Sequence, residues 1–128
     1  MFKRILQVSL AAAMTLTVVG AAPASANDGD VIRRGSCSGS TDWKLKLSPE
    51  DGRIEVEYEV DSNKVGQTWK VRIFKNDERI FRGTRTTTAP SGSFEVRVVT
   101  SNTAGTDDFR ARAKNLSTGE ICGGKASF

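Results

Sequence analysis

From Asp42 onward, hydrophobic residues recur at every second position, which is the period of a β-strand with one buried face. In the clearest stretch, Val56, Tyr58 and Val60 alternate with glutamates. The alternation predicts seven short strands, centred on residues 43–47, 54–60, 69–73, 79–84, 94–98, 109–114 and 121–122. No window has the 3.6-residue period of an amphipathic helix.

Clusters of Gly, Asn, Asp, Ser and Pro separate these segments and indicate turns, for example at residues 48–52 and 76–78. Short strands that each have one apolar face pack as two antiparallel sheets, face to face. The sequence therefore predicts an all-β fold: a two-sheet antiparallel sandwich of about seven strands that occupies residues 42–128 as one domain.

The first 26 residues follow a different pattern. Lys3 and Arg4 precede a largely apolar run from Ile5 to Val19, and Ala24-Ser25-Ala26 has the small-residue form that signal peptidases cleave. The run is too short for a stable membrane span. We expect residues 1–26 to be a signal peptide, residues 27–41 to be a loose polar leader, and the mature protein to be exported without a transmembrane segment.

The sequence contains two cysteines, Cys37 and Cys122, close to the two ends of the expected mature chain. In an oxidising exterior, such a pair is typical of one disulfide. A metal pair or a reactive thiol is the alternative, although a metal site usually needs more Cys or His ligands and the chain has no histidine.

Residues 107–115, with the sequence DDFRARAKN, resemble the strand signature D-x-Y-x-C-x-A-x-N of immunoglobulin-like domains. Phe109 stands where that family has its corner tyrosine, and Ala111 stands where it has its second cysteine. Trp69 is similar to the buried tryptophan of the family's third strand, and residues 75–77 suit the turn that follows it. The resemblance covers about residues 42–125.

The resemblance implies an immunoglobulin-like sandwich, with the strands at 43–47, 54–60 and 94–98 in one sheet and those at 69–73, 109–114 and 121–122 in the other. Two family features are missing: the disulfide between the sheets and the hydroxyl of the corner tyrosine. A Cys37–Cys122 bond that ties the entry segment to the last strand would offset the first loss. The leader and the small size also resemble those of small uncharacterised secreted proteins of high-GC Gram-positive bacteria.

The distribution of charge along the chain is more informative than its net value. Removing Lys3 and Arg4 from the 19 basic residues leaves 17 against 15 acidic residues, so the mature net charge is only +2. The implied sheets nevertheless divide these charges unevenly. The outward positions of the second sheet are all basic: Lys70, Arg72, Arg110, Arg112 and Lys114, with further cations at Arg79, Arg82 and Arg85. Like charges on neighbouring strands destabilise a sheet, and a polyanion would relieve the repulsion. The alternative is a basic face that is only solvated, since surface lysines and arginines commonly keep a sheet soluble and guard against edge-to-edge aggregation.

Catalysis has little support in this sequence. Without histidine the usual general base is missing, and no nucleophile elbow, phosphate loop or dinucleotide fingerprint occurs. Glu55, Glu57 and Glu59 share a strand face, but we expect that face to be flat and solvated, without the cleft that would raise a carboxyl pKa, and to pair with Lys44, Lys46 and Arg97. Asp107 and Asp108 suggest calcium, yet the resemblance makes Asp107 a structural residue of a turn. We therefore expect no enzyme, cofactor or metal.

The sequence leaves three functions open, all for a secreted monomer. The first is a binding module whose basic face, Lys70, Arg72, Arg110, Arg112 and Lys114, holds an anionic cell-envelope polymer or an acidic protein, without specific reading of nucleic acid. The second is a carbohydrate-binding module, which needs a row of exposed aromatic rings; Phe74 and Phe81 are the best candidates, because the other large aromatic residues fall on inward positions. The third is a structural scaffold that binds a protein through loops or an edge strand.

Overall fold

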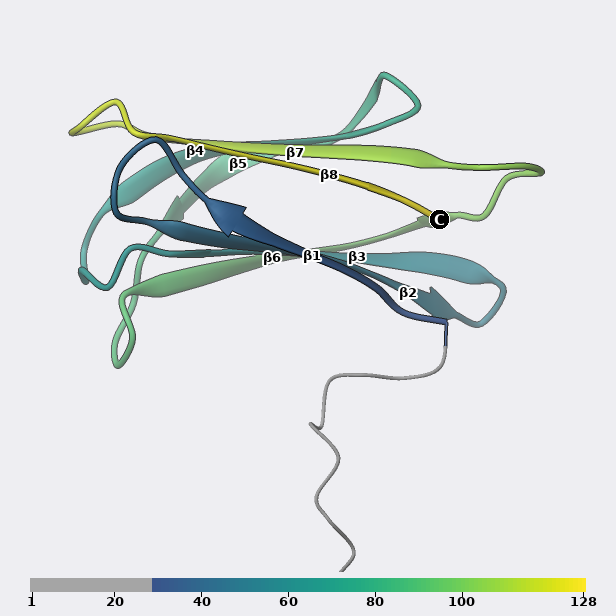
Figure 1. The fold of residues 1–128 in the computed structure, drawn as a ribbon, viewed down its shortest axis with the longest axis horizontal. Helices are drawn as coiled ribbons and strands as arrows, with labels where there is room; N and C mark the ends of the chain where they lie inside the picture. The colour runs from purple at the N-terminus through teal and green to yellow at the C-terminus, as the bar shows by residue number, and fades with distance from the viewer. Residues whose placement is uncertain (1–28) are drawn as a thin grey trace, which may run out of the picture.

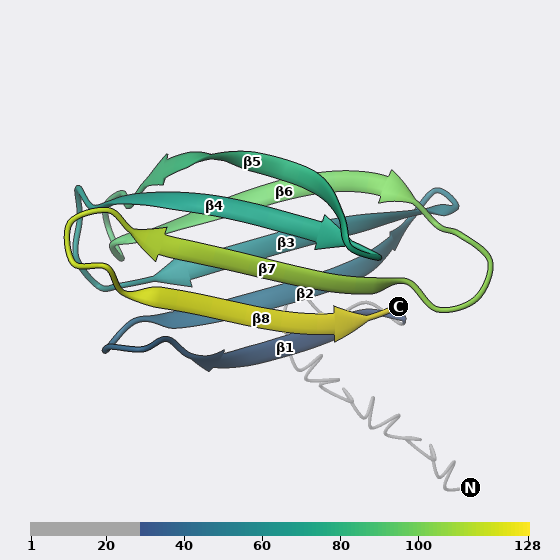
Figure 2. The same ribbon diagram turned by 90° about the horizontal axis from the view of Figure 1, so that it is seen from above.

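The computed structural model describes residues 29–128, and these form a sandwich of two antiparallel four-stranded sheets (Figure 1). The first sheet has the order β1-β2-β3-β6, with β1 (Val31–Ser36), β2 (Asp42–Glu50), β3 (Arg53–Asp61) and β6 (Ser93–Ser101). The second sheet has the order β5-β4-β7-β8, with β4 (Thr68–Lys75), β5 (Glu78–Thr86), β7 (Asp108–Asn115) and β8 (Ile121–Ser127). Seen from above, the second sheet covers the first (Figure 2).

The all-β sandwich predicted from the alternation is confirmed, including the division of strands between the sheets. The number of strands was wrong, because part of the expected polar leader forms β1, which pairs with β2 from Val31–Leu47 to Ser36–Asp42. β1 lies at the edge of its sheet and is held by backbone pairing. Its side chains therefore have no need to alternate: Val31 and Ile32 are both half-buried, and the next two residues are both exposed. The expected signal peptide, residues 1–26, lies outside the described residues.

Two tight turns determine the register of the hairpins. β2 and β3 are joined by Asp51 (φ 47°) and Gly52 (φ 75°), and β4 and β5 by Asn76 (φ 46°) and Asp77 (φ 65°). Two consecutive residues with positive φ are the mark of a type I′ turn, whose twist matches that of the strands it connects. The turn predicted at residues 48–52 is thus shorter than expected, because β2 continues through Pro49 to Glu50.

The core fills the space between the sheets and comes from the alternating positions that the sequence indicated. Trp69, Tyr58 and Phe109 are its largest buried side chains, and the ring of Trp69 lies 6.4 Å, centroid to centroid, from that of Phe94. The smaller buried members are Leu45, Leu47, Ile54, Val56, Val60, Val71, Ile73, Val96, Ala111, Ala113, Cys122 and Ala126. Alternate residues of the same strands consequently point outward.

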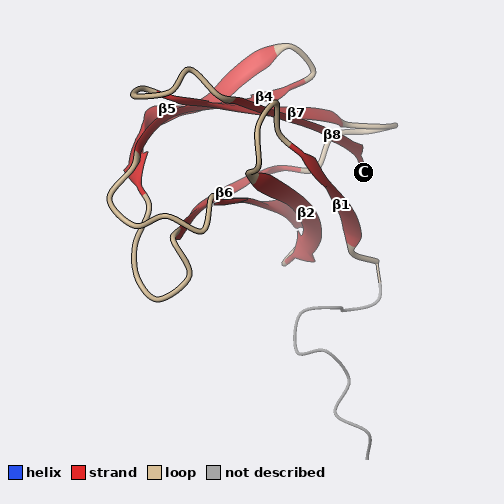
Figure 3. Ribbon diagram, turned by 60° about the vertical axis from the view of Figure 1, so that its left-hand side comes forward, coloured by secondary structure: helices blue, strands red, loops and turns tan. Residues whose placement is uncertain are grey.

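One side of the sandwich is closed where β1 lies against β8, opposite the side where β5 meets β6 (Figure 3). The predicted disulfide is confirmed at this side: Cys37, just after β1, is bonded to Cys122 in β8. It joins positions 85 residues apart, and the loop-entropy model gives about 4 to 5 kcal/mol of stabilisation for a loop of that length.

Trp43 fills the same side and depends on two glycines. Its half-buried ring packs against Gly35 of β1 and Gly124 of β8, and a Cβ atom at either glycine would lie 2.7 Å or 2.6 Å from the nearest ring carbon. Real Cβ atoms do not approach so closely. The absence of a side chain at both positions therefore makes room for the indole between the two edges.

The core position of Trp69 predicts a large loss of stability on truncation. We expect Trp69→Ala to lower the free energy of unfolding by about 3 to 5 kcal/mol, because it leaves a cavity between the sheets. Thr84→Ala, on the exposed face of β5, should change it by no more than about 0.5 kcal/mol. Urea unfolding of both variants measures this difference, and equal midpoints would contradict the inward register of β4.

Adjacent glycines in β8 give a second, sharper prediction. Gly124→Ala should destabilise the protein by about 1 to 3 kcal/mol, because the added methyl group meets the Trp43 ring. The Cβ atom that Gly123→Ala adds has no neighbour within 4 Å. Because the substitution lowers the conformational entropy of the unfolded chain, the free energy of unfolding should be unchanged or higher by up to about 1 kcal/mol. Thermal melts of the pair test the packing of Trp43, and an equal loss in both variants would refute it.

Candidate functional site

The outer surface of the second sheet carries a set of basic side chains that we call the cationic face. Its members come from all four strands of that sheet: Lys70, Arg72, Arg79, Arg82, Arg110, Arg112, Lys114 and Lys125. Residues directly opposite each other in an antiparallel pair point to the same face. The register therefore places the five cations predicted from the sequence, Lys70, Arg72, Arg110, Arg112 and Lys114, on one surface.

The strand pairing arranges the cationic face in three rows that cross the sheet. The first row contains Thr84, Lys70, Lys114 and Ile121. The middle row contains Arg82, Arg72, Arg112 and Gly123. The third row contains Arg79, Phe74, Arg110 and Lys125. Every row has a cation from β7, and in the middle row arginines occupy three neighbouring strands.

The structure corrects the membership of this face at two residues. Arg85 was expected on it, but Arg85 is opposite the inward Trp69, and its guanidinium lies 5.0 Å from the ring centroid of Phe81. Lys125 was missed, because β8 was expected to be only residues 121–122. The weak signal for its full length is the alternation of Cys122, Gly124 and Ala126, whose side chains are small.

No ion pair neutralises the cationic face within residues 29–128. Every salt bridge there lies at the outer side of the other sheet, where Lys46 contacts Asp30 and Glu57, and Arg97 contacts Glu50 and Glu55. Arg110 instead stacks on Phe74, with its guanidinium carbon 4.7 Å from the ring centroid. At the end of the face, Asp108 accepts a hydrogen bond of 2.6 Å from the hydroxyl of Ser127.

Besides a recess that Arg110 and Lys125 share with Asp77 and Asp108, two recesses without an acidic lining residue open among these cations. Lys70, Arg72, Arg112 and Lys114 enclose a hollow of about 250 Å³ between β4 and β7. A second hollow, of about 360 Å³, lies between β7 and β8. It is bounded by Arg110, Arg112, Ile121, Gly123 and Lys125, together with Ala111 and Gly124. Since a side chain at Gly123 would meet nothing within 4 Å, this glycine leaves the second recess open.

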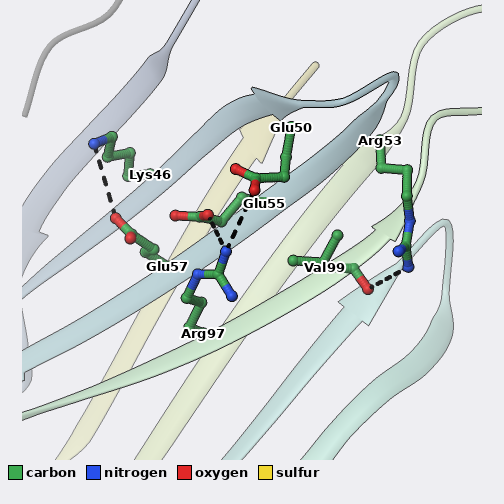
Figure 4. A network of polar contacts seen from close by, with 7 residues as sticks. All are labelled: Lys46, Glu50, Arg53, Glu55, Glu57, Arg97 and Val99. Atoms are coloured by element: carbon green, nitrogen blue, oxygen red, sulfur yellow. Dashed lines mark hydrogen bonds and ion pairs between the residues drawn. The ribbon is translucent and has the colours of Figure 1, made fainter.

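The opposite outer face, on the first sheet, contains its own counter-charges (Figure 4). Arg97 donates a hydrogen bond of 2.6 Å to Glu55, and the Lys46 ammonium lies 3.8 Å from the carboxylate of Glu57. The predicted pairing of the glutamates is thus confirmed for Lys46 and Arg97, whereas Lys44 lies opposite Glu59 and makes no ion pair within residues 29–128. The two outer faces differ in charge. The first carries both signs and several ion pairs, although Glu59 and Glu95 lie directly opposite each other, and the second has a surplus of positive charge.

Glu57 departs from the expectation that this face would leave carboxyl pKa values unperturbed. The pKa of Glu57 rises to about 7, first because it shares a hydrogen bond with Glu55, and then because it is partly desolvated and lies near Glu95. The pKa of Glu55 is lowered by the same hydrogen bond and by Arg97. Glu55 and Glu57 occupy successive outward positions of β3, which brings their carboxyl groups together. The shift in pKa therefore needs no enclosing cleft.

Asp107 ties two loops to the end of the chain. Its buried carboxylate accepts hydrogen bonds from the backbone N–H of Thr103 (3.0 Å), from the Thr103 hydroxyl and from the Asn76 amide (2.8 Å). Its backbone exchanges two hydrogen bonds with Phe128. The Thr103 hydroxyl holds the pKa of Asp107 below its ordinary value. These contacts give Asp107 a structural role, and no cluster of three potential metal ligands occurs in residues 29–128.

Aromatic rings form no exposed row in the part of the chain that the structure describes. Its exposed large hydrophobic residues are Val65 and Leu116, both in loops. Phe74 and Phe81, the candidates for sugar stacking, are half-buried, and each lies beneath an arginine. Neither of these two rings therefore offers an open face to a sugar.

Comparison of the chain with protein-family models, with curated proteins and with solved structures yields no match. Within residues 29–128, no helix is long and apolar enough to cross a membrane. Residues 29–128 thus form an eight-stranded β-sandwich with one disulfide and a cationic face on its second sheet.

The raised pKa of Glu57 predicts how stability depends on pH. The folded protein holds this proton up to about pH 7, whereas the unfolded chain releases it near pH 4.5. Stability should therefore fall as the pH rises from about 4.5 to 7. Glu57→Gln, which cannot ionise, should remove this fall, whereas Glu78→Gln on the other sheet should retain it. Melting temperatures across this pH range measure the effect, and a flat profile for the unmodified protein would refute the shared proton.

Proposed function

We propose that this protein is a secreted, non-catalytic binding module of the immunoglobulin-like type, and that its cationic face holds an anionic polymer. The observation that carries the proposal is the middle row, where Arg82, Arg72 and Arg112 lie on adjacent strands with no acidic neighbour in the row. Like charges directly opposite each other destabilise the sheet. An anionic ligand relieves that repulsion when it binds.

The secreted location rests on two features. The N-terminal sequence has the basic, apolar and small-residue regions of a signal peptide, and the disulfide between Cys37 and Cys122 is of a kind that persists in oxidising compartments. Outside the cell, the available anionic polymers are envelope polymers, nucleic acid and acidic proteins. A repetitive polymer suits a face whose cations repeat in rows.

The arginines suit an oxyanion such as phosphate. A guanidinium presents a planar fork of N–H donors that fits a phosphate or carboxylate in two-point contact, and its charge is always present. Arginine supplies Arg72, Arg79, Arg82, Arg110 and Arg112, while lysine supplies the remaining cations of the face.

A protein partner is the second candidate, favoured by a separate observation. Val65 and Leu116 are exposed apolar side chains in the β3–β4 and β7–β8 loops. These loops lie at the same end of the sandwich, where the N–H of Leu116 donates to the carbonyl of Thr68. Two exposed residues make a small contact, so this end is a weaker candidate than the cationic face.

Charge reversal tests the proposed function. Arg110→Glu combined with Arg112→Glu should abolish most binding to a phosphate polymer, while Arg33→Glu combined with Arg34→Glu, exposed on β1, changes the net charge equally and should have little effect. Affinity for the unmodified protein should fall steeply with added salt, because each neutralised phosphate releases counterions. The double variant of the face should also have a salt slope lower by about two. Equal losses in the two double variants would refute a localised site.

A further inference from the structure

The rows of the cationic face have a repeat that a polymer can match. Within a strand, positions two residues apart lie about 6.6 to 6.8 Å apart, so Lys114, Arg112 and Arg110 mark this interval along β7. Lys70 and Arg72 mark it on β4, in the same rows. The face is therefore a regular ladder of cations, with one row for each interval.

Resting on the proposed function, we infer that the ligand is a linear phosphodiester polymer with three-carbon linkers and without bases, of the poly(glycerol phosphate) kind, lying along β7 with one phosphate at each row. Two residues of an extended strand contain six backbone bonds. A phosphodiester chain with a three-carbon linker also has six bonds from one phosphorus to the next, so its extended repeat is about 7 Å as well. Consecutive phosphates then meet consecutive rows.

The recess at Gly123 suits this arrangement. It lies beside Arg112 in the middle row, and Arg110 and Lys125 bound it in the third row. The linker between two phosphates needs open space of this kind, because cationic side chains project from the positions on either side of it. An open hollow of about 360 Å³ provides it next to the β7 cations.

Single-stranded nucleic acid has the same six-bond repeat but a different requirement. Its binding proteins stack bases on exposed aromatic side chains. Phe74 is the aromatic residue of the three rows, and the guanidinium of Arg110 occupies its ring. The ring of Phe74 is therefore not open to a stacked base, which favours a polymer that has none.

The spacing of the phosphates and the absence of bases in the ligand are tested by competition binding at about 10 mM salt, where the screening length is about 30 Å. The probes are poly(glycerol phosphate), poly(ribitol phosphate) with its five-carbon linker, and oligothymidylate, matched in number of phosphates. We expect poly(glycerol phosphate) to bind about tenfold more tightly than either of the others. Equal affinity for all three would overturn the inference and leave the proposed function standing, and tighter binding of oligothymidylate would replace it with a nucleic-acid ligand. No binding of any probe would overturn the proposed function itself.

Substitutions at Gly123 test the position of the polymer. Gly123→Glu places a carboxylate beside Arg112 and should weaken poly(glycerol phosphate) binding about tenfold, whereas the neutral, equally large Gly123→Gln, which only fills the recess, should weaken it about threefold. Both side chains enter open space, so the melting temperature reports that the fold is retained. Binding by Gly123→Glu within twofold of that by Gly123→Gln would overturn the assignment of the recess.

Discussion

Burial of one face of each strand against the opposite sheet is the constraint from which the other features of this protein follow. Trp69, Tyr58 and Phe109 must point inward, and because side chains alternate along a strand, the residues between them must point outward. A shift of register by one residue would expose the whole apolar set. The positions of Arg72 and Arg112 on the surface are therefore determined by the hydrophobic residues beside them.

This constraint makes the two outer faces independent of each other and of the core. On the first sheet, the outward positions hold both signs of charge, and Lys46 and Arg97 pair with the glutamates of β3. On the second sheet, the same kind of position holds arginine and lysine in successive rows. The fold would be satisfied by either composition, so the surplus of positive charge on one face is a property of the sequence that folding does not require.

The sequence predicted the strands correctly where hydrophobic and polar residues alternate strongly. It was not sufficient to predict a strand that is held by backbone pairing alone. The inward position of Trp69 and the common face of Lys70 and Arg112 followed from period-two patterns. The edge strand β1 did not, since its pairing with β2 needs no alternating burial, and the length of β8 was hidden by its glycines. Arg85 was misplaced because the register of β4 and β5 shifts next to Phe74, a local irregularity with no clear mark in the sequence.

The alternation of hydrophobic and polar residues also could not predict how the outward side chains interact with one another. Whether Glu57 shares a proton with Glu55 depends on the rotamers of the two side chains and on the interaction of Arg97 with Glu55. The strand pattern contains neither kind of information. The disulfide was different, because a single pair of cysteines leaves few alternatives. Topology brings Cys37 and Cys122 together where β1 and β8 meet, beside the ring of Trp43.

The closed side and the cationic face are linked through β8. Gly124 points inward to make room for Trp43, while its neighbour Gly123 points outward and leaves the recess beside Arg112 open. A side chain at the first position would disturb the packing of the sandwich, and one at the second would not. Stability therefore explains the glycine at position 124 but not the one at position 123. The proposed anionic ligand would account for a bare position in the middle row, because it would lie in the recess that Gly123 leaves open.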